Sequence, residues 1–176
     1  MPTSKPPMRV GWTGHRPHYF RAPAEAAAAV QRAAEELRRE VARPLVFITG
    51  GQRGVDLWAA EAAMQLGVPY HVYLPLPLAQ FAADWDAADR AALERVWAAA
   101  AERRVLDERG DFGPGAYTLR NQAIAEECDL LVAVWTGRTG GGTHETVSFA
   151  RALSKPIREV LLPAADVPSD PAARGL

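Results

Sequence analysis

Hydrophobic positions along the chain alternate between two patterns. Short apolar runs rich in β-branched residues are typical of buried strands, and they occur at residues 8–13, 45–49, 68–74, 130–135 and 157–162. Longer segments with apolar residues at helical spacing separate these runs, at residues 22–41, 55–66, 87–102, 117–127 and 143–153. This alternation predicts a Rossmann-like three-layer α/β/α sandwich around a mainly parallel sheet of five or more strands.

The chain length of 176 residues is that of one domain. We expect this nucleotide-binding domain to span residues 8–163, between a flexible amino-terminal segment (1–7) and a flexible or loosely docked tail (164–176). Residues 104–106 could add a short strand, and the glycine-rich segment 110–115 predicts a loop that could serve as a flap.

Composition narrows the function classes. The formal net charge of −1 provides no global field for a polyanion, so we do not expect nucleic acid as a partner, and any anion site must be local. No apolar segment approaches about 18 residues, which excludes a membrane span and favours a cytoplasmic protein. Cys128 is the single cysteine and predicts a packed thiol. The histidine spacings predict no metal site, and we expect no cofactor.

Three expected strands end in glycine-rich loops, where ligands collect in parallel sheets. In the first loop, Gly14 would let the backbone approach a ligand and Arg16 could contact phosphate, although a simple tight turn explains this stretch equally well. The second loop carries Gly50, Gly51, Arg53, Gly54 and Asp56 directly before a helix, and free amides there would form an anion site.

The second loop lacks the features of a standard NAD site. Thr49 stands where the dinucleotide fingerprint requires its first glycine. The next strand ends in Leu74-Pro75 without the acidic residue that binds ribose. We therefore reject a standard NAD dehydrogenase.

The third loop runs from Gly137 to Thr143 and opens a helix, which is the geometry that cradles phosphate. Thr143 stands where a Walker loop needs lysine, which argues against nucleoside triphosphate hydrolysis of that type. A turn capped by Thr143 is the simpler alternative. It needs one glycine, whereas Gly140, Gly141 and Gly142 form a run of three, so we favour a ligand.

Several short motifs, taken in order, resemble the SLOG superfamily. They are T-G-H-R-P at 13–17, G-V-D-L-W-A-A-E at 54–61, Arg120-Asn121, V-W at 134–135 and G-G-T at 141–143. This Rossmann-like group contains Smf/DprA and the LOG phosphoribohydrolases, and the resemblance is strongest to small bacterial proteins with a T-G-H-R-P motif. It runs from about residue 8 to 157 and implies a nucleotide-related ligand.

The resemblance also implies a pair of catalytic residues. LOG enzymes cleave nucleoside 5′-monophosphates with an arginine, which Arg120 matches, and a glutamate. Counting from Gly142-Thr143, the glutamate position falls on Thr146, and Glu145 stands one residue earlier. One residue turns a helical side chain by about 100°, so Glu145 need not face the same pocket.

Three functions follow from these observations. The first is binding or sensing of a phosphate-bearing nucleotide or nucleotide-derived ligand. The second is a nucleoside 5′-monophosphate N-glycosidase using Arg120 and Glu145. The third, ranked last, is a DNA-associated module like DprA. The nucleotide-binding residues would be Gly14, Arg16, Gly50, Gly51, Arg53, Gly54, Asp56, Arg120, Asn121, Gly140, Gly141, Gly142 and Thr143. Alanine-rich faces at 22–41 and 87–102 favour a homodimer.

Overall fold

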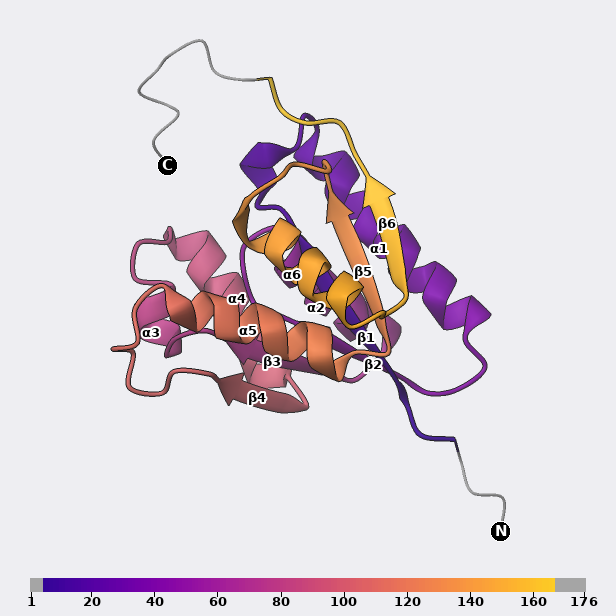
Figure 1. Ribbon diagram of the computed structural model, residues 1–176, viewed down its shortest axis with the longest axis horizontal. Coiled ribbons are helices and arrows are strands. Elements are labelled where there is room, and N and C mark those ends of the chain that lie inside the picture. The colour runs from indigo at the N-terminus through magenta and orange to yellow at the C-terminus, as the bar shows by residue number, and fades with distance from the viewer. Residues whose placement is uncertain (1–4, 167–176) are drawn as a thin grey trace.

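A six-stranded parallel sheet forms the centre of the molecule in the computed structural model, which describes residues 5–166 (Figure 1). The strand order is β4-β3-β2-β1-β5-β6. The strands are β1 (Met8–Gly14), β2 (Leu45–Thr49), β3 (Tyr70–Leu74), β4 (Glu102–Val105), β5 (Leu130–Trp135) and β6 (Ile157–Leu161). The predicted Rossmann-like α/β fold is confirmed.

Helices cover both faces of the sheet. They are α1 (Pro23–Glu40), α2 (Val55–Leu66), α3 (Leu78–Phe81), α4 (Ala87–Ala99), α5 (Gly115–Glu127) and α6 (Gly141–Ala152), with a 3-10 turn η1 (Pro17–Tyr19). Helices α5 and α6 lie in front of the sheet in Figure 1, and α1 and α2 lie behind it. Successive β5 residues show why two layers form: Val132 and Val134 join the core beneath α1 and α2, whereas Leu131 and Ala133 pack under α5 and α6.

The connections of β1 position the site. β1 pairs with β2 on one side and with β5 on the other, so the chain winds in opposite directions from this strand. In parallel sheets such a reversal opens a crevice beyond the carboxyl ends of the strands. The three glycine-rich loops follow β1, β2 and β5 and therefore meet at this crevice.

Some elements differ from the sequence expectation. β4 begins at Glu102, two residues earlier than the expected short strand at 104–106. Helix α5 begins at Gly115, within the segment predicted as a loop. The rest of that segment is anchored by Asp107, whose carboxylate accepts hydrogen bonds from the amides of Gly110 (3.0 Å) and Phe112 (2.8 Å).

Residues 1–4 and 167–176 lie outside the described chain, so most of the two expected flexible segments stay untested. At the start of the tail, the amide of Ala165 donates to the carbonyl of Tyr19 (2.9 Å). The alanines of α1 that face inward are buried within this chain, and the homodimer stays a prediction. No helix of the described residues has the length and apolar character to cross a membrane.

Candidate functional site

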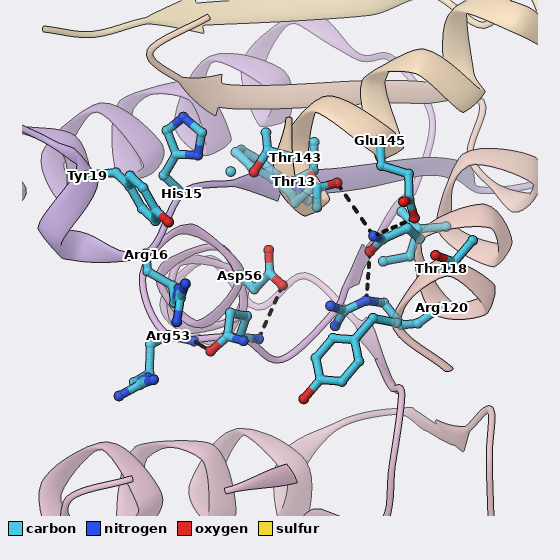
Figure 2. Close-up of a pocket in the computed structure, with 18 of the residues that line it drawn as sticks. Thr13, His15, Arg16, Tyr19, Arg53, Asp56, Thr118, Arg120, Thr143 and Glu145 are labelled. Atoms are coloured by element: carbon cyan, nitrogen blue, oxygen red, sulfur yellow. Dashed lines mark hydrogen bonds between the residues drawn. The ribbon is translucent and has the colours of Figure 1, made fainter. Parts of the chain in front are cut away.

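A cavity of about 540 Å³ opens at the carboxyl ends of β1, β2 and β5 (Figure 2). Its walls come from the loops after these three strands, from the first turns of α2 and α6, and from one side of α5. The loops after β2 and β5 thus lie at the same edge of the sheet, as predicted.

Most of the expected binding residues line this cavity. Those that do are Gly14, Arg16, Arg53, Asp56, Arg120, Asn121, Gly140, Gly141, Gly142 and Thr143, together with Glu145. Gly50, Gly51 and Gly54 do not line it. The three exceptions all belong to the loop after β2, which therefore needs a separate explanation.

The loop after β2 is packed against the protein itself. A side chain at Gly50 would collide with the Arg120 guanidinium, and one at Gly51 (φ 72°) with Leu74. At Gly54 (φ 86°) a side chain would collide with the carbonyl of His15. Here glycine admits neighbouring protein groups to the loop.

The amides of the same loop are also occupied. Gly51 donates to Thr49 Oγ1 (3.3 Å), Gln52 to Asp56 Oδ2 (3.2 Å), and Arg53 to Gln52 Oε1 (2.9 Å). The amide of Val55 donates to the carbonyl of His15 (3.3 Å). Internal acceptors already occupy these amides, so they are less available to an anion than the sequence indicates, and an anion site at this helix start stays a prediction.

The loop after β5 has the opposite character. Gly140 and Gly141 both have φ of 82°, and a side chain at either would find no described atom within 4 Å. Gly140 is the N-cap of α6 and makes no side-chain capping bond. The first amides of α6 therefore face the cavity, where the helix dipole favours an anion.

Three arginines gather at one part of the cavity. Arg16 and Arg138 lie over the Tyr19 ring, at 5.7 and 4.9 Å from its centroid. Arg53 lies 4.9 Å over the ring of Trp85. These cation–π contacts hold the guanidinium groups at the cavity wall. Arg138 is not among the residues expected from the sequence, although its place between Gly137 and Gly140 was a usable signal.

The opposite part of the cavity holds a hydrogen-bonded chain of side chains (Figure 2). Arg120 donates through Nε to Asn121 Oδ1 (2.9 Å) and through Nη1 to the carbonyl of Gly50. Asn121 Nδ2 donates in turn to Glu145 Oε1 (3.3 Å). Glu145 thus faces the cavity despite its one-residue offset. Thr146, at the expected glutamate position, is buried and bonds back to the carbonyl of Gly142 (2.8 Å).

Burial shifts the pKa values of Asp56 and His15, and it lowers that of Arg120 as well. Desolvation raises the pKa of Asp56 to about 6, although the charge of Arg120 and the amide of Gln52 act in the opposite direction. Desolvation, with the charge of Arg138, lowers the pKa of His15 to about 4, so this imidazole is neutral at pH 7. Its Nε2 lies 3.1 Å from Thr136 Oγ1.

Several aromatic side chains line the cavity and could contact a base. Trp12 belongs to the lining but is fully buried in the core, and Trp135 does not line the cavity. Tyr19, Trp85 and Tyr117 also line it. Tyr117 precedes Arg120 by one helical turn of α5, which places both on one side of that helix.

Residues 12–155 match the family model described as the YspA SLOG family. UPF0398 proteins of Bacillus cereus (strain B4264) and Bacillus thuringiensis (strain Al Hakam) are each 28% identical over 107 residues, 59% of this chain. The matched region is 58% of each relative, so the alignment spans little more than half of their length. The family match confirms the predicted SLOG resemblance.

Two solved structures share the fold. DNA processing protein A (DprA) from Streptococcus pneumoniae has a TM-score of 0.65 at 20% identity, covering 87% of this chain and 50% of that protein. DprA from Helicobacter pylori has a TM-score of 0.65 at 17% identity, covering 91% of this chain and 69% of that protein. At these identities the similarity concerns the fold.

The Helicobacter pylori structure also corrects one expectation. That protein has a single-stranded DNA binding mode. Excluding nucleic acid because the net charge is −1 was therefore wrong. Arginines gathered at one cavity can supply a local phosphate site without a basic surface.

Proposed function

The chain belongs to the YspA SLOG family, and we propose that its cavity binds a phosphate-bearing nucleotide or a nucleotide-derived ligand. The main support for this proposal is the start of α6. No described side chain caps the helix there, and its exposed glycines line the cavity. Helix amides and dipole together favour a phosphate at that position.

The arginines support the same placement. Arg16, Arg53 and Arg138 line the cavity, and guanidinium groups make charge-assisted hydrogen bonds to phosphate oxygens. The Tyr117 ring at the other side provides a surface on which a base can stack. A cavity of about 540 Å³ is within the range of small-molecule sites.

Calorimetric titration with AMP tests this proposal. Arg138→Ala should weaken AMP binding by about 1.5–3 kcal/mol, the range for a hydrogen bond to a charged group. Arg138 is suitable because it is exposed and its loss leaves the core intact. The control is Arg39→Ala, which removes the same charge from an exposed position of α1 outside the cavity. No heat and no thermal shift with AMP, ADP or phosphate would refute the proposal.

Arg120→Ala should weaken AMP binding as well, but it is a less selective test. Arg120 is buried and donates to the carbonyl of Gly50 and to Asn121. Removing the side chain leaves buried acceptors without a donor, which itself costs about 1–3 kcal/mol of stability. Affinity and unfolding free energy therefore have to be measured together for this variant.

N-glycosidase activity is the second candidate, because Glu145 faces the cavity and is linked through Asn121 to Arg120. In that reaction water adds to C1′ of the ribose, the C1′–N bond breaks, and the base leaves with a proton. Chromatography would detect free base released from nucleoside monophosphates. Binding alone predicts no release and an AMP affinity that Glu145→Gln leaves unchanged or raises.

Glu94→Gln is the matched control for this assay, because Glu94 is exposed on α4 outside the cavity. Base release by the wild type that Glu145→Gln abolishes and Glu94→Gln retains would establish the enzyme. This result would replace binding alone as the function of the site.

Single-stranded DNA is the third candidate, favoured by the binding mode of the Helicobacter pylori protein. Competition between AMP and an oligodeoxythymidylate distinguishes the two ligands. If DNA is the ligand, the oligomer should bind far more tightly than AMP and lose affinity steeply with salt. If a free nucleotide is the ligand, the oligomer should not displace AMP at comparable concentrations.

A further inference from the structure

Asp56 is a nearly buried carboxylate at the centre of the candidate site. Its side chain belongs to the first turn of α2 and lines the cavity, yet the residue is only 7% exposed. Oδ2 accepts a hydrogen bond from the amide of Gln52 (3.2 Å). The backbone amide of Gly50 also acts on this carboxylate. Among the described residues no side chain donates to it, so a ligand in the cavity can supply a further donor.

Arg120 does not supply that donor. Its Nε and Nη1 groups bond to Asn121 and to the carbonyl of Gly50, and among the described residues it forms no ion pair with Asp56. Figure 2 shows Asp56 in the middle of the site, with Arg16 and Arg53 on one side and Arg120 on the other. The carboxylate therefore lies between the arginine group and the Tyr117 side of the cavity.

A carboxylate in this position selects the part of the ligand that it can contact. It repels phosphate and accepts hydrogen bonds from hydroxyl or amino groups. In a nucleotide the sugar joins the phosphate to the base. In the site, Asp56 lies between Arg16 and Arg53 on one side and Arg120, which contacts Tyr117, on the other. In such a placement the vicinal 2′- and 3′-hydroxyls of ribose would be the donors that reach the Asp56 carboxylate.

On this basis, and resting on the proposed nucleotide site, we infer that Asp56 binds the ribose hydroxyls and makes the cavity selective for ribonucleotides over 2′-deoxyribonucleotides. The sugar would then fill the hydrogen-bonding capacity that the protein leaves open. The pKa of Asp56, which burial raises to about 6, leaves the carboxylate ionised at about pH 8, where it is the strongest acceptor.

The test compares AMP with 2′-deoxy-AMP in wild type and in Asp56→Asn at about pH 8. We expect wild type to prefer AMP about tenfold or more, the effect of a hydrogen bond to a charged group. Asp56→Asn should abolish the preference by weakening AMP binding and leaving 2′-deoxy-AMP nearly unchanged. The asparagine oxygen can still accept from Gln52, which preserves the turn. Asp111→Asn, an exposed change outside the cavity, should keep the preference.

Each other outcome has a distinct meaning. Equal affinity of the wild type for both ligands overturns the inference and leaves the nucleotide site standing, whereas no binding of either overturns both. IMP lacks the amino group of the adenine base. If the wild type binds IMP more weakly than AMP but binds 2′-deoxy-AMP as well as AMP, Asp56 contacts the base, which contradicts the inference. If Asp56→Asn fails to fold, the wild-type comparison with 2′-deoxy- and 3′-deoxy-AMP still decides it.

Discussion

The loops after β2 and β5 both lead from a buried strand through glycines into a helix, yet the protein uses them differently. The loop after β2 closes on itself: Thr49, Asp56 and the carbonyl of His15 occupy its amides. The loop after β5 leaves Gly140 and Gly141 open to the cavity. Both loops are rich in glycine, so glycine content alone does not distinguish them. Whether a ligand can bind depends on whether the protein already occupies the backbone amides of the loop.

This contrast assigns the two loops separate tasks. The closed loop holds Asp56 and Arg53 in place from a rigid turn. The open loop presents to the cavity the first amides of α6, which no described side chain caps. A binding site needs both, because a rigid support reduces the ordering cost of the groups that contact the ligand.

Gly54→Ala should have the largest effect, on the free energy of unfolding. Gly54 has φ 86° and ψ −129°, and an added methyl group would collide with the carbonyl of His15. Backbone strain and the displaced loop together should cost about 3 kcal/mol or more. Gly67→Ala is the control: its φ is also positive (64°), but no described atom lies within 4 Å, and it should cost about 1 kcal/mol. If denaturant unfolding shows that the two variants lose the same free energy of unfolding, the added methyl group at Gly54 does not collide with His15.

Gly141→Ala should act mainly on binding. The methyl group has free space at φ 82°, so strain alone should cost about 1–2 kcal/mol of stability. AMP affinity should fall at least about tenfold, because the methyl group enters the cavity beside the α6 amides. Gly113→Ala is the control, because Gly113 has φ 77°, equally free space and a position outside the cavity. This variant should lose a similar amount of stability but keep its affinity for AMP. If both variants bind AMP with equal affinity, the loop after β5 does not contact the ligand.

The sequence predicted the layered fold because central parallel strands are buried on both faces and read as apolar runs. It placed the start of β4 two residues late, since this edge strand reads Glu-Arg-Arg-Val and carries little apolar pattern. Helix α3 and the turn η1 were missed because elements of three or four residues show no periodicity.

The site was predictable only in part. Strand-end position identified the three loops, and the family resemblance identified Arg120. The state of each loop depends on contacts between distant segments, such as Arg120 reaching Gly50 across 70 positions of sequence. Such contacts cannot be predicted from the local sequence around either residue. The orientation of Glu145 was unpredictable for the same reason, whereas Arg138 had a local signal in its place between Gly137 and Gly140.

Acidification should reduce the preference for AMP over 2′-deoxy-AMP. The pKa of Asp56 is raised to about 6, so the carboxylate takes up a proton as the pH falls through that value and becomes a weaker acceptor. The pKa of His15, lowered to about 4, keeps that imidazole neutral. Both ligands carry the same phosphate, so its ionisation cancels in the affinity ratio. A constant ratio between about pH 8 and pH 5 would contradict the ribose contact.

Thr49→Val should have the smallest effect and sharpens the comparison most directly. Thr49 is fully buried, and its Oγ1 accepts the Gly51 amide at 3.3 Å. Valine keeps the shape but leaves that amide unpaired, which should cost about 1 kcal/mol of unfolding free energy. AMP affinity should stay unchanged, because the Gly51 amide belongs to the closed loop. Thr139→Val, an exposed change in the open loop, should leave stability unchanged and serves as the control. A fall in AMP affinity with Thr49→Val would mean that the Gly51 amide reaches the ligand, and the two loops would then share one task.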